Sequence, residues 1–130
     1  MIQIAGGILV RDGTLLLGRR AMHKRICPDM WDIIGGHVEA GESAEQALAR
    51  ELREEIGVVP VAMSRIGAVP FADGTDAYTL HVFRVDAWTD DPVLADDEHS
   101  ELRWFTVEAA SSLPDLAAKE YVELFRGLQA

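Results

Sequence analysis

Residues 35–58 read GGHVEAGESAEQALARELREEIGV and place six glutamates among glycines and a short apolar pattern. The part from Ser43 onward predicts a helix, because Ser43 and Gln46 form an S-x-x-Q capping box at its start. Gly57 suits the position after the last helical turn, where a left-handed backbone favours glycine. Both ends of this helix are therefore marked in the sequence.

Three glutamates of this helix, Glu51, Glu54 and Glu55, project from one narrow arc. At about 100° per residue, Glu55 lies about 40° to one side of Glu51 and Glu54 about 60° to the other. An apolar stripe is centred about 100° from Glu51 and must face the core. We therefore expect the carboxylates at the boundary between core and solvent. The stripe consists of Leu48, Leu52 and Ile56.

So much like charge in one place calls for a physical reason. Like charges three and four residues apart on a helix repel each other, and partial burial raises carboxylate pKa values. A bound divalent cation reverses the sign of this effect, and several carboxylate oxygens suit Mg²⁺, with Mn²⁺ as the alternative. The competing interpretation is a solvated amphipathic helix with pairs such as Arg50–Glu54.

The spacing around these glutamates separates the two interpretations. Gly36 is followed after five residues by Glu42, and after seven more by RELREEIGV at residues 50–58. This string matches the Nudix box, G-x5-E-x7-R-E-U-x-E-E-x-G-U with U aliphatic, at every specified position. The chain therefore resembles the Nudix hydrolases. The resemblance implies an α/β fold, a Nudix-type α/β/α sandwich with a mixed β-sheet.

The resemblance also implies roles for the residues of the box. Arg50 corresponds to the arginine that orients the glutamates by charge-assisted hydrogen bonds. Glu42 corresponds to a glutamate that supports the metal site from a second layer of contacts. The direct metal ligands correspond to the Gly35 carbonyl oxygen, Glu51, Glu54 and Glu55.

The implied reaction is hydrolysis of a nucleoside diphosphate linked to some moiety X. Metal ions neutralise the diphosphate and lower the pKa of the attacking water, and a carboxylate takes the proton. Besides the box glutamates Glu51 and Glu54, the segment DDEHSELRWF, residues 96–105, offers Glu98 as this base. Glu101 stands at the start of a predicted strand, where relatives often supply an extra metal ligand, so we assign it to metal binding.

A basic segment lies just before the box, in GRRAMHKRICPDMW at residues 18–31. The R-x3-K spacing of Arg20 and Lys24 resembles that of Nudix-fold isopentenyl diphosphate isomerases, where such residues grip the diphosphate. Gly35 stands where those isomerases place a catalytic cysteine, so the isomerase activity itself is not expected. We retain phosphate binding for Arg20 and Lys24, with exposed loop charges as the competing interpretation.

The rest of the chain alternates predicted strands with helices, which favours an α/β fold. Asp12-Gly13 marks a hairpin turn within residues 2–20. Residues 31–36, WDIIGG, predict a short strand ended by two glycines, and residues 114–128 predict a terminal helix with Pro114 near its start. Further strands are expected at residues 61–71, 77–88 and 101–107, with an acidic loop at 89–100.

Composition limits the classes of function. The 130 residues suit one domain, 1–130, and a net charge of −10 argues against a nucleic-acid-binding protein. Cys27 is the only cysteine, so a disulfide scaffold is excluded. The N-terminal residues do not form a signal peptide, and no apolar run reaches the length of a membrane span, so we expect a cytoplasmic protein. The resemblance favours a homodimer.

The leading hypothesis is a Mg²⁺-dependent Nudix pyrophosphohydrolase. A small chain with little beyond the box resembles house-cleaning enzymes that cut nucleoside triphosphates to monophosphate and pyrophosphate. ADP-ribose and nucleotide sugars are alternative substrates, and a nucleotide-sensing domain without catalysis is an alternative function. The aromatic residues that could stack on a nucleobase are Trp31, Phe71, Tyr78, His81 and Phe83.

Overall fold

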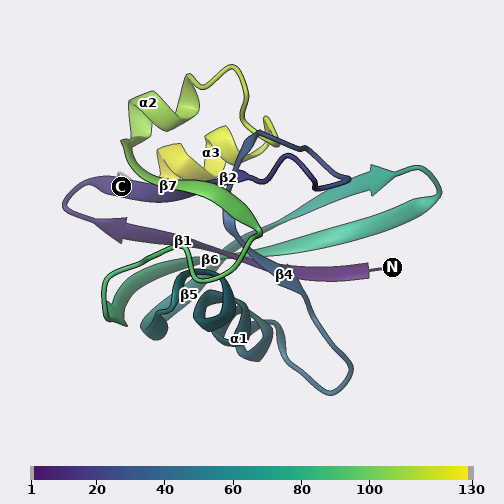
Figure 1. Ribbon diagram of the computed structural model, residues 1–130, viewed down its shortest axis with the longest axis horizontal. Coiled ribbons are helices and arrows are strands. Elements are labelled where there is room, and N and C mark those ends of the chain that lie inside the picture. The colour runs from purple at the N-terminus through teal and green to yellow at the C-terminus, as the bar shows by residue number, and fades with distance from the viewer. Residues whose placement is uncertain (1, 129–130) are drawn as a thin grey trace.

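A mixed β-sheet lies between helices in the computed structural model, which describes residues 2–128 (Figure 1). The helices are α1 (Ala44–Ile56), α2 (Val107–Ser111) and α3 (Tyr121–Gly127). The strands are β1 (Ile2–Arg11), β2 (Thr14–Arg20), β3 (Trp31–Asp32), β4 (Ile34–His37), β5 (Val59–Asp73), β6 (Asp76–Thr89) and β7 (His99–Thr106). Five strands follow the order β3-β2-β1-β6-β5, while β4 pairs with β1 and β7 with β2. Because β1 runs parallel to β6 and its other pairings are antiparallel, the predicted mixed sheet is confirmed.

The two faces of the sheet carry separate apolar cores. Successive residues of a strand point to opposite faces, and β1 uses this alternation at Ile8 and Leu9. Ile8 packs in the core that includes Phe125 of α3, and Leu9 packs in the core that includes Leu48 of α1. Helix α1 thus covers one face, and α2 and α3 cover the other (Figure 1). In the described part of the chain, no helix has the length and apolar character needed to cross a membrane.

The hairpin between β1 and β2 forms where Asp12-Gly13 predicts it. Both residues have positive φ, 52° at Asp12 and 76° at Gly13, as a two-residue turn matching the twist of the strands requires. Arg11 and Thr14 pair directly on either side of the turn. The hairpin sets the register of β1 and β2, the strands against which β4 and β7 pair.

The strand predicted for residues 31–36 is wrong in two respects. Residues 31–37 form two strands instead of one, because β3 pairs with β2 whereas β4 pairs with β1. The glycines do not end the strand either, since Gly35 and Gly36 pair with Gly6 and Ala5 and β4 continues to His37. A side chain at position 35 would overlap the Ala5 carbonyl oxygen, so this strand needs glycine where the sequence suggests a break.

The predicted terminal helix is only half present, and α2 was not predicted. Helix α3 begins at Tyr121, seven residues after Pro114. The preceding residues run beside β3 instead, where Trp31 donates its N–H to the Asp115 carbonyl and accepts from Ala117 N at 2.8 Å. This pairing satisfies backbone groups that a helix would have used, and it ties the C-terminal segment to the strand that enters the box.

Candidate active site and metal centre

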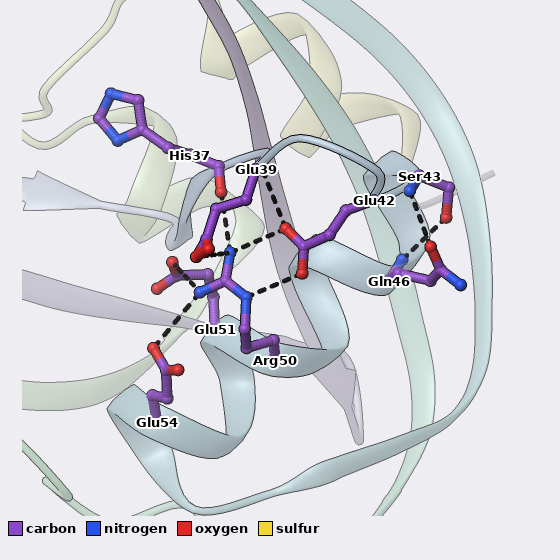
Figure 2. Close-up of polar contacts among 8 residues, drawn as sticks. All are labelled: His37, Glu39, Glu42, Ser43, Gln46, Arg50, Glu51 and Glu54. Atoms are coloured by element: carbon purple, nitrogen blue, oxygen red, sulfur yellow. Dashed lines mark hydrogen bonds and ion pairs between the residues drawn. The ribbon is translucent and has the colours of Figure 1, made fainter.

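Helix α1 presents the glutamates in a fixed orientation because both of its ends are capped. The Ser43 hydroxyl accepts from Gln46 N at 3.1 Å, and the Gln46 side chain accepts from Ser43 N at 2.9 Å, as Figure 2 shows. Gly57 ends the helix with φ of 71°. The predicted capping box and glycine cap are both confirmed. The core-facing stripe is fully buried and consists of Leu48, Leu52 and Ile56.

The three clustered glutamates differ strongly in exposure. The side chain of Glu55 is 4% exposed, that of Glu51 16% and that of Glu54 54%. This order follows the helical count, since Glu55 is turned toward the apolar stripe and Glu54 away from it. The cluster therefore runs from the core to the solvent along one arc of the helix.

The Arg50 guanidinium lies among the carboxylates of Glu39, Glu42, Glu51 and Glu54 (Figure 2). Its Nε and Nη2 donate to the two carboxylate oxygens of Glu42 at 2.9 and 3.0 Å, and its Nη1 donates to Glu51 at 2.9 Å. Nη2 also donates to the His37 carbonyl at 3.0 Å, which ties α1 to the end of β4. Hydrogen bonds from Arg50, and then from the Glu39 N–H, lower the pKa of Glu42 to about 2.

Glu55 and His99 form the buried end of the cluster. His99 Nδ1 lies 3.7 Å from Glu55 Oε1, and both side chains are 4% exposed. Burial, followed by the neighbouring Glu51, raises the pKa of Glu55 well above its usual range. Burial, followed by the Arg20 charge, lowers the pKa of His99 to about 4. His99 was not among the residues predicted for the site, since its only indication in the sequence was its position next to Glu98.

The glycines of β4 let the backbone approach the cluster closely. A Cβ at Gly36 would lie 2.5 Å from the Glu51 carboxylate, so the missing side chain makes room for that group. Gly35, whose carbonyl oxygen is a predicted metal ligand, lines the same cavity as Glu51 and Glu55.

One cavity of about 730 Å³ joins the acidic cluster to the basic loop. Arg20 and Lys24 both line it and are only 21% and 27% exposed, so they are not free loop charges. Lys24 forms an ion pair with Glu98, which lowers the pKa of that carboxyl. Arg20 donates from Nε to the Ile26 carbonyl at 2.7 Å. The cavity therefore holds both signs of charge.

The cavity lining also includes the half-buried carboxylate of Asp32, which lies 3.4 Å from Arg20, and two aromatic rings. Asp32 Oδ1 accepts from the Tyr121 hydroxyl at 2.7 Å, and burial raises the pKa of this aspartate. Phe71 and Tyr78 line the cavity and stack on each other with ring centroids 4.8 Å apart. Of the other aromatic candidates, Trp31 and Phe83 are buried in the cores, and His81 does not line the cavity.

Comparisons with known proteins identify the family of the chain. A family model described as NUDIX domain matches residues 1–128. The chain belongs to the Nudix family. It is 32% identical to a CTP pyrophosphohydrolase of Escherichia coli, over 100% of this chain and 95% of the relative. It is also 32% identical to an NAD-capped RNA hydrolase of Pseudomonas aeruginosa, over 82% of this chain and 37% of the relative.

A solved structure shows the same fold in this family. The solution structure of the Escherichia coli ORF135 protein aligns with a TM-score of 0.85 and 30% identity, over 100% of this chain and 91% of that protein. The predicted Nudix-type sandwich is thereby confirmed. As a member of this family, the protein is a hydrolase that acts on phosphoric anhydride bonds.

Arg50 and Glu42 do not line the cavity, and two of the metal ligands assigned from the sequence, Glu54 and Glu101, also lie outside it. Glu101 lies within β7, where its carboxylate accepts from Arg103 Nε at 3.0 Å and from Arg103 Nη2 at 2.6 Å. Glu54 is held 3.5 Å from Arg50 near the solvent. Neither belongs to the cavity lining of the Nudix site. The residues that the fold does bring to the cavity are Arg20, Lys24, Gly35, Glu51, Glu55 and Glu98.

The donor set of the Nudix box fits a hard divalent cation. Within residues 2–128, no three acidic, histidine or cysteine side chains are already arranged as a metal cage, and Arg50 instead bridges Glu51 and Glu54. Glu55 Oε2, however, is buried without any hydrogen-bond partner. A buried carboxylate oxygen that lacks a donor and lies beside further carboxylates matches the oxygen ligands that Mg²⁺ and Mn²⁺ prefer.

Proposed function

We propose that the chain is a Mg²⁺-dependent pyrophosphohydrolase that cleaves nucleoside triphosphates to monophosphate and pyrophosphate. The observation that carries this proposal is the single cavity that joins Glu51 and Glu55 to Arg20 and Lys24. Carboxylates suit a cation and the basic residues suit phosphate oxygens, so together they match a metal-bound polyphosphate. Asp32, Phe71 and Tyr78 line the same cavity and would contact the nucleoside.

Each residue of the site takes a role that follows from its contacts. Glu51, Glu54 and Glu55 would hold the cation together with the Gly35 carbonyl, and Mg²⁺ would supply charge neutralisation and a lowered pKa for the attacking water. Arg50 fixes Glu51 directly and is itself fixed by both oxygens of Glu42. Glu54 does not line the cavity but lies on the same arc of α1 as Glu51 and Glu55, whereas Glu101 lies on β7 and is bonded by Arg103, so Glu101 is left out of the proposed ligand set.

The Lys24–Glu98 pair couples substrate binding to proton transfer in this proposal. In the free protein the Lys24 ammonium is paired with Glu98 and lowers its pKa, which makes Glu98 a weak base. A phosphate group arriving at Lys24 would compete for the ammonium. Glu98, freed from this partner, would then be a stronger base and could accept the proton of the attacking water.

A triphosphate substrate is favoured by how the relatives align. The CTP pyrophosphohydrolase is covered over 95% of its length, whereas the NAD-capped RNA hydrolase is covered over only 37%. The net charge of −10 also favours a free nucleotide over a nucleic acid. ADP-ribose or nucleotide-sugar hydrolysis and nucleotide sensing stay as alternatives, and the cytoplasmic location and the homodimer stay predictions.

A substrate panel tests this proposal. The full chain is incubated with Mg²⁺ and nucleoside triphosphates, ADP-ribose or nucleotide sugars, and pyrophosphate release is scored against monophosphate release. We expect pyrophosphate from triphosphates, and we expect Glu54→Gln to lower kcat more than about 100-fold, beyond the ~10–100-fold typical of groups that only orient ligands. Its free energy of unfolding should stay unchanged or rise, because the substitution removes like-charge repulsion.

Glu123→Gln is the matched control, because Glu123 lies on α3 with a side chain that is 86% exposed. This variant should turn over nucleotides at the wild-type rate. Full activity of Glu54→Gln would show that the ligand assignment is wrong. Binding of a nucleotide without hydrolysis would favour the sensing alternative. Preferential cleavage of ADP-ribose would show that the substrate is ADP-ribose and not a nucleoside triphosphate.

A further inference from the structure

The His99 imidazole packs against a glycine of β2. His99 begins β7, which pairs with β2 beside Gly18. A Cβ at Gly18 would lie 2.5 Å from His99 Cδ2 and 2.9 Å from His99 Cγ. Because position 18 carries no side chain, the imidazole can pack directly against the β2 backbone. The ring is thereby held at the inner end of the acidic cluster.

Two unsatisfied polar groups meet at this place. In residues 2–128, only three buried side-chain nitrogen or oxygen atoms lack a hydrogen-bond partner, namely Glu55 Oε2, His99 Nδ1 and Ser111 Oγ. The first two belong to one pair, whose nearest atoms, Nδ1 and Oε1, are 3.7 Å apart. A buried polar atom without a partner costs about 1–3 kcal/mol, so such atoms are rare unless a function retains them. Their pairing points to a shared role.

Of the three clustered glutamates of α1, Glu55 is the one that Arg50 does not contact. The guanidinium contacts Glu51 at 2.9 Å and Glu54 at 3.5 Å, but it forms no ion pair with Glu55 in the described structure. A glutamate side chain has several rotatable bonds, so a ligand carboxylate needs a second contact to fix its direction. His99, at the start of β7, is the buried residue placed to provide that contact, with its Nδ1 3.7 Å from Glu55 Oε1.

We propose that His99 is a positioning residue for the metal site, whose Nδ1–H donates to Glu55 Oε1 and so directs Oε2 toward a hard divalent cation. The inference rests on the proposed function, because it assigns the partner of a proposed ligand. A shift of about half an ångström brings the 3.7 Å separation into hydrogen-bond range. Both unsatisfied atoms then have partners, one in the protein and one in the cation.

The test measures Mn²⁺ binding to the full chain by electron paramagnetic resonance, without nucleotide. Asn at position 99 places its amide nitrogen near the Nδ1 position, Gln places it near Nε2, and Phe keeps only the ring. We expect His99→Gln and His99→Phe to weaken Mn²⁺ binding about 10-fold or more, and His99→Asn to recover most of it. His81→Gln is the control, since His81 lies on the sheet outside the cavity.

Wild-type affinity in His99→Gln and His99→Phe would overturn the proposal, as would equal losses in all three variants. Nitrogen NMR of the wild-type ring gives a second test that needs no variant. The proton should reside on Nδ1 with and without Mg²⁺, and a ring protonated on Nε2 alone would contradict the inferred bond. Mn²⁺ binding that depends on His99 in a protein that cleaves no nucleotide would support this inference while rejecting the proposed hydrolysis.

Discussion

Arg50 is the residue on which the charge balance of the box depends. It lies within 3.5 Å of four carboxylates, those of Glu39, Glu42, Glu51 and Glu54. A planar guanidinium can bind Glu42 with two nitrogens while a third reaches Glu51, which a lysine ammonium cannot do with the same geometry. Arg50 therefore limits repulsion in the free protein and keeps Glu51 facing the cavity.

The Glu42–Arg50 contact predicts a specific acid sensitivity. The folded-state pKa of Glu42 is about 2, below the ordinary value of 4.5, so its ionised form stabilises the fold at any pH above that ordinary value. This contribution is lost as the pH falls from about 4.5 to about 2. Glu42→Gln should lower the free energy of unfolding at pH 7, and the difference from wild type should shrink through that window in urea titrations.

Glu39→Gln is the control for this prediction. Glu39 also lies near Arg50, at 3.4 Å, but its side chain is 61% exposed, and an exposed ion pair contributes little. Its substitution should leave stability at pH 7 almost unchanged. A Glu42→Gln difference that stays constant down to pH 2.5 would mean that the contact stabilises the protein by packing and not by charge.

At the scale of the element, β4 predicts opposite outcomes for two adjacent glycines. Gly35→Ala places a methyl group against the Ala5 backbone, which cannot move without breaking the β1–β4 pairing. It should lower the free energy of unfolding by several kcal/mol, as overpacking does when the neighbour is rigid, on the order of 3 kcal/mol. At Gly36 the three atoms nearest to an added Cβ all belong to the Glu51 carboxylate group, the closest at 2.5 Å, so the added methyl group meets the end of a flexible side chain.

Gly36→Ala should therefore fold with nearly wild-type stability but displace the Glu51 carboxylate. The expected result is a loss of Mg²⁺-dependent turnover of about 10-fold or more, without a matching loss in thermal stability. Thermal unfolding and the Mg²⁺ dependence of hydrolysis, measured on both variants, separate the two effects. Equal stability losses at the two positions would show that Glu51 cannot adjust and that β4 acts as one rigid unit.

Helix α1 could be predicted from sequence because everything that defines it is local. Its apolar stripe repeats with the helical period, and Ser43, Gln46 and Gly57 mark its ends. The C-terminal segment could not be predicted in the same way, because residues before Tyr121 give up helical bonds for a pairing with Trp31, which lies far away in the chain. The extent of β4 could not be predicted, because Gly35 and Gly36 continue the strand by pairing with β1, whereas their own conformational preference suggests a break.

The whole molecule assembles the cavity from segments that are distant in sequence. Lys24 meets Glu98 across 74 residues, and Asp32 meets Tyr121 across 89. The box could be recognised from spacing alone, whereas these two contacts depend on the fold, which brings the residue before β7 to the loop after β2 and α3 to β3. His99 was missed for the same reason, since nothing near it in sequence indicates that it faces Glu55.

At this scale the proposed cation should stabilise the fold. The chain carries a net charge of −10, so added salt relieves general repulsion by screening, whereas Mg²⁺ bound only by the native state adds a specific term. At a Mg²⁺ concentration 100 times Kd that term is about 2.7 kcal/mol. The free energy of unfolding measured by urea titration in MgCl₂ should therefore exceed that in NaCl of equal ionic strength by roughly this amount.

Two variants test whether this Mg²⁺-specific stabilisation comes from the proposed site. Glu55→Gln should abolish it, because the substitution removes the buried ligand, while Asp97→Asn in the exposed acidic loop should keep it. If NaCl stabilises the wild type as much as MgCl₂ does, the native state holds no specific cation, and the charge pattern of α1 needs another explanation.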